Sequence, residues 1–189
     1  MSLRTLFAGV AILAASTVAY AQDVAPEDRM TIELESGPVV IGLRSDLAPQ
    51  HVERIKTLAE QGAYDGVAFH RVIDGFMAQT GDVQFGKGDN MSRAGTGGSD
   101  LPNLPAEFTT SETFDRGTVG MARAQDPNSA NSQFFIMLDD GPFLDGQYTV
   151  VGDVIEGMEN VDQIKKGNPA RNGAIEGEPD RMLDVTVGS

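Results

Sequence analysis

Short stretches in which polar and apolar residues alternate recur along the chain, which is the pattern of half-buried β-strands. Residues 31–35 alternate in this way, and Ser36-Gly37-Pro38 then turns the chain into the apolar run 39–43, so we expect a hairpin. Six further runs have the composition of strands: 68–73, 76–80, 117–122, 133–137, 149–154 and 182–187.

Two stretches have the spacing of amphipathic helices. Asp46 can cap a helix that accepts Pro49 in its first turn and ends at Gly62. A second, shorter helix fits residues 157–166, where two lysines suit the negative end of the helix. The apolar faces contain Val52, Ile55 and Leu58 or Ala59 in the first helix, and Met158, Val161 and Ile164 in the second.

Eight strands joined mostly by turns or glycine-rich loops indicate a mainly β protein, either an antiparallel sandwich or a closed barrel. Side chains usually fill the interior of an eight-stranded barrel, so a ligand would bind in a groove on the outer wall. Residues 81–105 are rich in Gly, Asp, Asn and Ser, and we interpret them as a long surface loop rather than a domain linker.

The first 21 residues have the three-part pattern of a secretory signal peptide: Arg4, an apolar run over 6–18 and the small-x-small site Ala19-Tyr20-Ala21. The apolar run is shorter than the roughly 20 residues that span a bilayer. The alternative is a buried first helix. We expect cleavage after Ala21, which leaves residues 22–189 as one periplasmic or secreted domain without a membrane attachment.

Composition narrows the function classes. The chain has 14 basic and 28 acidic residues and a formal net charge of −14, so nucleic acid and anionic lipid are improbable partners. It has no cysteine, which excludes disulfides, a thiol nucleophile and a thiolate metal site. We expect His51 on the surface of its helix and His70 buried and hydrogen-bonded. We predict no metal ion and no cofactor.

The most informative stretch is 69–82, where Arg71 stands among aromatic and apolar residues with no nucleophile beside it. If strands flank the turn at Asp74-Gly75, Arg71 lies across from Gln79 or Phe76. Gln79 could then hold the guanidinium by a side-chain hydrogen bond. The alternative for Arg71 is an exposed arginine on a sheet.

Residues 69–82, Phe-His-Arg-Val-Ile-Asp-Gly-Phe-Met-Ala-Gln-Thr-Gly-Asp, resemble the central signature of the cyclophilins, which are peptidyl-prolyl cis–trans isomerases. Residues 131–136 and 143–152 resemble the next two signatures of that family. The resemblance covers nearly all of 30–187. It implies a closed eight-stranded antiparallel β-barrel capped by two α-helices, and an enzyme that accelerates X-Pro isomerisation during the folding of exported proteins.

The resemblance also implies roles for individual residues. Arg71 resembles the catalytic arginine, and Phe76 and Gln79 match positions that act with it. The implied substrate-binding residues are Met77, Ala122, Arg123, Gln133, Phe135, Phe143, Leu144 and Tyr148.

Three of these positions depart from the best-known eukaryotic pattern. Phe143 replaces a tryptophan and loses its indole N–H donor, so we expect weak binding of cyclosporin. Tyr148 replaces a histidine but keeps a polar tip. Arg123 replaces an asparagine and lacks an amide's acceptor, which we expect to change peptide preference.

We expect the partners to be proline-containing unfolded or extended polypeptides, and the protein to be a monomer. The alternative function is a non-catalytic chaperone module that binds proline-containing peptides. The arginine favours the enzyme, because a pure binding module has no need of it.

Overall fold

The computed structural model describes residues 24–88 and 91–188, so the expected signal peptide lies outside the described residues. Each of the eight expected strand regions contains a strand. Within the described ranges, no helix is long and apolar enough to cross a membrane. The strands are β1 (Arg29–Leu34), β2 (Gly37–Leu43), β3 (Arg71–Ile73), β4 (Met77–Thr80), β5 (Thr118–Met121), β6 (Phe134–Met137), β7 (Val150–Glu156) and β8 (Asp184–Val187). The helices are α2 (Pro49–Glu60) and α3 (Met158–Asp162), with 3-10 turns η1 (Pro26–Asp28), η2 (Pro142–Leu144) and η3 (Pro169–Arg171).

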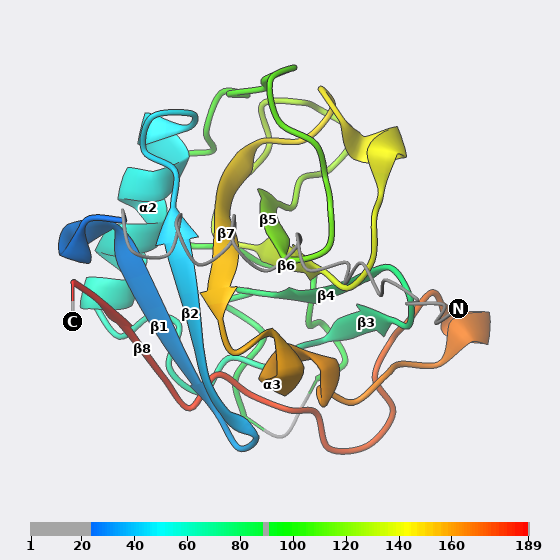
Figure 1. The fold of residues 1–189 in the computed structure, drawn as a ribbon. Helices are drawn as coiled ribbons and strands as arrows, with labels where there is room; N and C mark the ends of the chain where they lie inside the picture. The colour runs from blue at the N-terminus through cyan, green and yellow to red at the C-terminus, as the bar shows by residue number, and fades with distance from the viewer. Residues whose placement is uncertain (1–23, 89–90, 189) are drawn as a thin grey trace, which may run out of the picture.

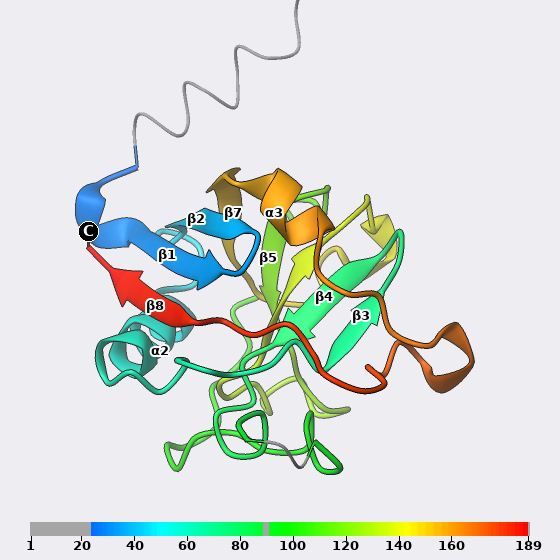
Figure 2. The ribbon, with the colours of Figure 1, turned by 90° about the horizontal axis from the view of Figure 1, so that it is seen from below.

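The strands form one antiparallel sheet in the order β3-β4-β6-β5-β7-β2-β1-β8, and this sheet is strongly curled (Figures 1 and 2). The expected closed barrel is wrong, because β3 and β8 are the two ends of an open sheet. Irregular backbone before each of these strands joins the ends instead. Ala68 and Arg181 form an isolated bridge, and the Met182 N–H donates to the Val67 carbonyl over 2.9 Å.

The start of α2 is fixed by a side chain from far along the chain. Asp46, the expected cap, instead pairs with Arg44, with 2.8 Å between Oδ1 and Nε. The Glu107 carboxylate accepts the backbone N–H groups of Gln50 at 3.2 Å and His51 at 3.1 Å. Glu107 therefore caps the positive end of the helix in place of Asp46. Local spacing could not indicate this cap, because Glu107 is far from α2 in the sequence.

The second helix is shorter than expected. α3 ends at Asp162, and Lys165 forms hydrogen bonds with the loop that follows. Its backbone N–H donates to Asp180 Oδ2 at 2.7 Å, and its ammonium donates to the carbonyls of Glu176 and Glu178.

The two faces of the sheet bury different clusters, because successive side chains of a strand point to opposite sides. On β6, Phe134 and Ile136 belong to the larger buried cluster, here called the main core, to which α2 adds Val52 and Ile55. Phe135 of β6 belongs to a second cluster, here called the site core. The site core consists of Met77, Phe114, Phe135, Met137, Leu144 and Val150.

One histidine differs from expectation in its burial, and the other differs only in its hydrogen bonding. His51 is fully buried rather than on the surface, and its Nδ1 lies 2.7 Å from Glu107 Oε2. The ring nitrogens of His70 are buried but make no hydrogen bond with the described residues. Burial lowers the pKa of both histidines, and Glu107 partly opposes this for His51.

The lowered pKa of these two histidines predicts that acid destabilises the fold. A histidine whose pKa is lower in the folded state binds protons more readily when unfolded, so stability falls as pH drops below about 6.5. We expect the free energy of unfolding, measured by urea denaturation, to decrease between pH 7 and pH 5. The double variant His51→Gln/His70→Gln should show a flatter dependence. An unchanged slope in that variant would contradict the assignment.

Candidate functional site

Arg71 and Gln79 face each other across the β3–β4 hairpin, as one of the two expected registers had it. They are Cα partners in the ladder, and Arg71 Nη1 donates to Gln79 Oε1 over 3.1 Å. Arg71 is half-buried, so it is not the freely exposed arginine of the alternative interpretation.

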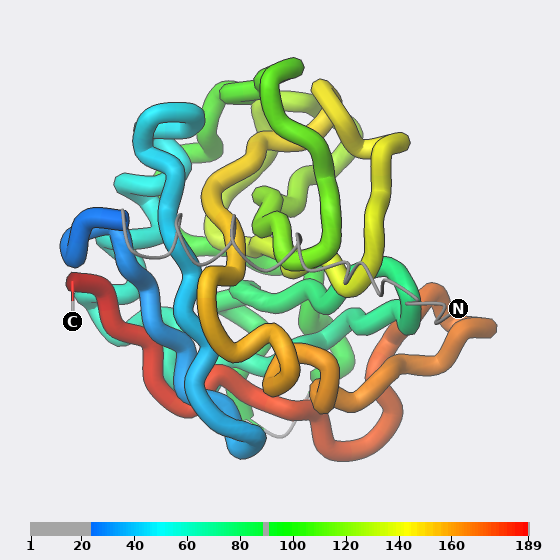
Figure 3. The backbone as a smooth tube through the Cα atoms, viewed as in Figure 1, coloured from blue at the N-terminus to red at the C-terminus, as the bar shows by residue number. Residues whose placement is uncertain are grey.

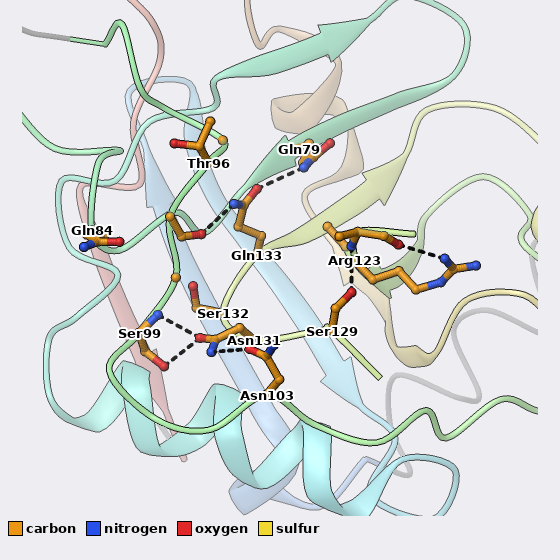
Figure 4. Close-up of a pocket in the computed structure, with 15 residues that line it drawn as sticks. Gln79, Gln84, Thr96, Ser99, Asn103, Arg123, Ser129, Asn131, Ser132 and Gln133 are labelled. Atoms are coloured by element: carbon orange, nitrogen blue, oxygen red, sulfur yellow. Dashed lines mark hydrogen bonds between the residues drawn. The ribbon is translucent and has the colours of Figure 1, made fainter. Parts of the chain in front are cut away.

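A chain of amide hydrogen bonds fixes the orientation of Gln79. Its Nε2 donates to Gln133 Oε1 at 3.0 Å, and Gln133 Nε2 donates to the Gly97 carbonyl at 2.8 Å (Figure 4). Because each amide nitrogen is committed to the next acceptor, the Gln79 oxygen must face Arg71. Gln133 thus acts on the arginine through Gln79.

Asp82 holds the loop that supplies Gly97, and the sequence analysis assigned it no role. This carboxylate is fully buried and accepts four backbone N–H groups, those of Gln84, Phe85, Gly95 and Gly97, at 2.7 to 3.1 Å. A buried carboxylate is stable when hydrogen bonds replace its lost hydration. Its position at the end of the 69–82 motif, before a glycine-rich stretch, was the available signal.

A second residue that the sequence analysis missed contacts the other edge of the guanidinium. Arg71 Nε donates to the Asn172 carbonyl and Nη2 donates to Asn172 Oδ1, both over 3.0 Å. The segment that carries Asn172 runs from α3 past β3, as the tube in Figure 3 shows. In the sequence, the Asn172-Gly173 pair indicates only a turn.

Arg71 borders a cavity of about 110 Å³ with an apolar floor. Phe135, Leu144 and Met77 are each at most 7% exposed, so the floor is fixed by the site core. Nine of the eleven expected site residues meet at this cavity. They are Arg71, Phe76, Met77, Gln79, Ala122, Arg123, Phe135, Leu144 and Tyr148.

The floor depends on a glycine in β5. The Phe114 and Phe135 rings stack with centroids 5.8 Å apart, and Tyr148 stands edge-on to Phe135 at 5.7 Å. A Cβ at Gly120 would lie 2.6 Å from atoms of both phenylalanine rings. The absence of a side chain at Gly120 therefore lets the rings pack here.

The two expected residues outside the cavity lie beside it. Gln133 is in the amide chain described above. Phe143 is 62% exposed, and its ring centroid lies 5.4 Å from that of Phe76 at the cavity rim.

Arg123 forms part of the wall rather than a free donor. Its Nε and Nη2 donate to the Gln147 carbonyl at 3.2 and 3.0 Å, and Nη1 donates to the Ala124 carbonyl at 2.9 Å. Its guanidinium carbon lies 4.6 Å from the centre of the Tyr148 ring. Arg123 therefore contributes a positive charge and part of the wall to the cavity that Arg71 borders.

A second, larger cavity of about 460 Å³ adjoins the first, and Gln79, Ala122 and Arg123 line both. Its walls are mostly amides and hydroxyls (Figure 4). Asn131 fixes one wall, since its Oδ1 accepts the Ser99 N–H at 2.7 Å. The two cavities together make a groove suited to an extended chain.

The charge of Arg71 is not neutralised by a described carboxylate, because no ion pair in the described part of the chain includes it. Burial lowers the pKa of its guanidinium, but an arginine side chain stays protonated in proteins. Among the described residues, no group of three or more His, Asp or Glu side chains could hold a metal ion. The site therefore offers a fixed cation and an apolar surface.

Comparison with known proteins places the chain in a family. Residues 29–187 match the model of the family described as "Cyclophilin type peptidyl-prolyl cis-trans isomerase/CLD". A probable peptidyl-prolyl cis-trans isomerase of Brucella suis is 58% identical over 190 residues, covering 98% of this chain and 96% of that protein. Peptidyl-prolyl cis-trans isomerase A of Dickeya dadantii is 33% identical with the same coverage.

Solved structures agree with the sequence comparisons. A cyclophilin of Hirschia baltica superposes with a TM-score of 0.72 at 26% identity, over 94% of this chain and 81% of that chain. A Cryptosporidium parvum cyclophilin, solved in the presence of the dipeptide Ala-Pro, gives 0.73 at 25% identity over 85% and 99%. This chain belongs to the cyclophilin-type peptidyl-prolyl cis–trans isomerases.

Proposed function

We propose that the protein accelerates X-Pro isomerisation in exported polypeptides, with Arg71 as its catalytic residue and the two adjoining cavities as the groove for an extended chain. The observation that carries this proposal is the clamped guanidinium above the apolar floor. The Ala-Pro dipeptide used with the Cryptosporidium parvum cyclophilin supports a proline-containing ligand.

Amide resonance is the barrier that such an enzyme must lower. Rotation about a peptide bond costs about 18–20 kcal/mol, and uncatalysed X-Pro isomerisation takes tens to hundreds of seconds. In the twisted transition state the proline nitrogen becomes pyramidal and gains a lone pair. A hydrogen bond from Arg71 to that nitrogen forms in the transition state and not in the planar ground state, which is the requirement for catalysis.

Arg71 keeps donors for this task. A guanidinium has five N–H groups, and three of them bond to Gln79 and Asn172. One of the remaining N–H groups is on Nη1, which lies 3.8 Å from the weak acceptor Met77 Sδ, and the other is on Nη2. We assign these N–H groups to the proline nitrogen.

The apolar floor supplies the second part of catalysis. Phe135, Leu144 and Met77 can receive the proline ring and remove water from the amide, which strengthens the hydrogen bond from Arg71. Phe76 and Tyr148 close the sides of this cavity. The polar cavity next to it can hold neighbouring residues of the substrate through its amide and hydroxyl groups.

Replacing Arg71 tests its proposed role. We expect Arg71→Ala to lower kcat/KM for a proline tetrapeptide about 10–100-fold, since a charge-assisted hydrogen bond is worth roughly 1.5–3 kcal/mol and each 1.4 kcal/mol is tenfold. Arg71→Lys should also be impaired, because lysine keeps the charge but lacks the planar fork. Wild-type rates in Arg71→Ala, with its fold verified by circular dichroism, would refute the role.

A chaperone module that only binds proline-containing segments is the alternative. An isomerase should accelerate refolding of a proline-limited protein at a small fraction of the substrate concentration, whereas a binding module acts only at stoichiometric amounts. Refolding rates should therefore rise at sub-stoichiometric wild-type protein and not with Arg71→Ala.

The packing around Gly120 predicts an activity change without any alteration of a groove residue. Gly120→Ala should push Phe135 into the cavity and lower kcat/KM about tenfold, with a stability cost of about 1–3 kcal/mol from overpacking. Adding Phe114→Leu makes room behind Phe135 and should restore part of the activity. No effect of Gly120→Ala on either activity or stability would contradict this packing.

We also propose that the protein acts outside the cytoplasm after loss of residues 1–21, and as a monomer. The signal-like pattern of Arg4, the apolar run and Ala19-Tyr20-Ala21 supports this location. N-terminal sequencing of protein recovered from the periplasm or medium should start at Gln22. Recovery of intact protein in the cytoplasm would contradict the proposal.

A further inference from the structure

We infer that Asn172 is a positioning residue for Arg71. This inference rests on the role proposed for Arg71. Asn172 is distant in sequence, yet it contacts two of the three guanidinium nitrogens: Nε through its carbonyl and Nη2 through Oδ1, both at 3.0 Å. Gln79 contacts only the third nitrogen, Nη1, at 3.1 Å. Together the two residues leave the guanidinium a single orientation.

The backbone at Asn172 is held in an unusual conformation. Its φ of 54° and ψ of 37° are left-handed, and no other non-glycine residue in the described ranges has a positive φ. Asparagine tolerates this region better than most residues. The conformation lets the carbonyl and the side-chain oxygen of one residue reach the same arginine, and such local strain is common at functional sites.

The loop that carries Asn172 is bound to the strand that carries Arg71. The Val72 N–H donates to the Gly173 carbonyl at 2.8 Å, and the Gly167 N–H donates to the Val72 carbonyl at 2.9 Å. The Gly173 N–H also donates to the Asn168 carbonyl at 2.9 Å. These backbone hydrogen bonds fix the position of Asn172 relative to Arg71.

The chemistry of the contact matters as much as its geometry. A carbonyl and an amide oxygen orient the guanidinium without neutralising its charge. An aspartate at 172 could accept the same hydrogen bonds and would fit the left-handed backbone, but its charge would reduce the positive field at the proline nitrogen. Asparagine satisfies both requirements.

Two substitutions separate this role from a merely structural one. Asn172→Gly keeps the left-handed backbone and the carbonyl but removes Oδ1, so we expect kcat to fall about 3–10-fold with the peptide dissociation constant unchanged. Asn172→Asp should fold like the wild type and also lower kcat. If Asn172 only stabilises its loop, Asn172→Gly will have wild-type kcat, and that result would overturn the inference.

Arg171→Gln is the matched control, because it makes the same change of charge at the adjacent residue. Arg171 is exposed, and its side chain is 3.4 Å from Glu176 rather than in the groove. We expect its kcat to equal that of the wild type. An equal loss in Arg171→Gln and Asn172→Asp would assign the effect of Asn172→Asp to net charge and reject the requirement for a neutral oxygen at position 172.

A spectroscopic readout is independent of turnover. Nuclear magnetic resonance of the Arg71 guanidinium should show slow rotation about the Nε–Cζ bond in the wild type and faster rotation in Asn172→Gly. Equal rotation rates would overturn the inference. Failure of the catalytic role of Arg71 would be distinguishable, because Arg71→Ala would then keep full activity. If Arg71→Ala loses activity while the Asn172 variants keep the wild-type rate, only the positioning role of Asn172 is rejected.

Discussion

The hydrogen-bonded guanidinium of Arg71 is the interaction on which the proposed mechanism depends. Neutral oxygens of Gln79 and Asn172 hold it on both edges. The positive charge is therefore oriented but not neutralised. In the proposed mechanism this charge meets a lone pair that exists only in the twisted amide, and the reaction then requires neither a nucleophile nor a proton-transfer group.

The two faces of the central strands β4 and β6 connect the site around Arg71 to the rest of the fold. One face of β4 and β6 packs on the main core and keeps the strands rigid, while the other carries the site core beneath the cavity. Alternate residues of one strand thus stabilise the fold and form the floor of the site. The buried carboxylate of Asp82 fixes the loop that supplies Gly97 by accepting backbone N–H groups of that loop.

The sequence predicted all eight strand regions, and it gave the Arg71–Gln79 pairing as one of two possible registers, because alternation and a short turn are local signals. It failed where distant segments meet. Glu107 caps α2 in place of Asp46, His51 is buried against that same carboxylate, and irregular backbone replaces a closed ladder. Asn172 lies 101 positions from Arg71, so no local pattern could indicate their contact. The motif resemblance identified the cavity residues and Gln79, which orients Arg71. It did not identify the contact of Asn172 with Arg71 or the role of Asp82 in the loop that supplies Gly97.

The most direct test is to replace Arg71 by citrulline, which keeps the planar shape and most N–H groups but carries no charge. The isomerisation rate of the bound peptide and its dissociation constant would be measured separately by exchange-based nuclear magnetic resonance. We expect the rate on the enzyme to fall at least tenfold while the dissociation constant stays the same. An unchanged rate, or a loss confined to binding, would contradict transition-state stabilisation by the guanidinium charge.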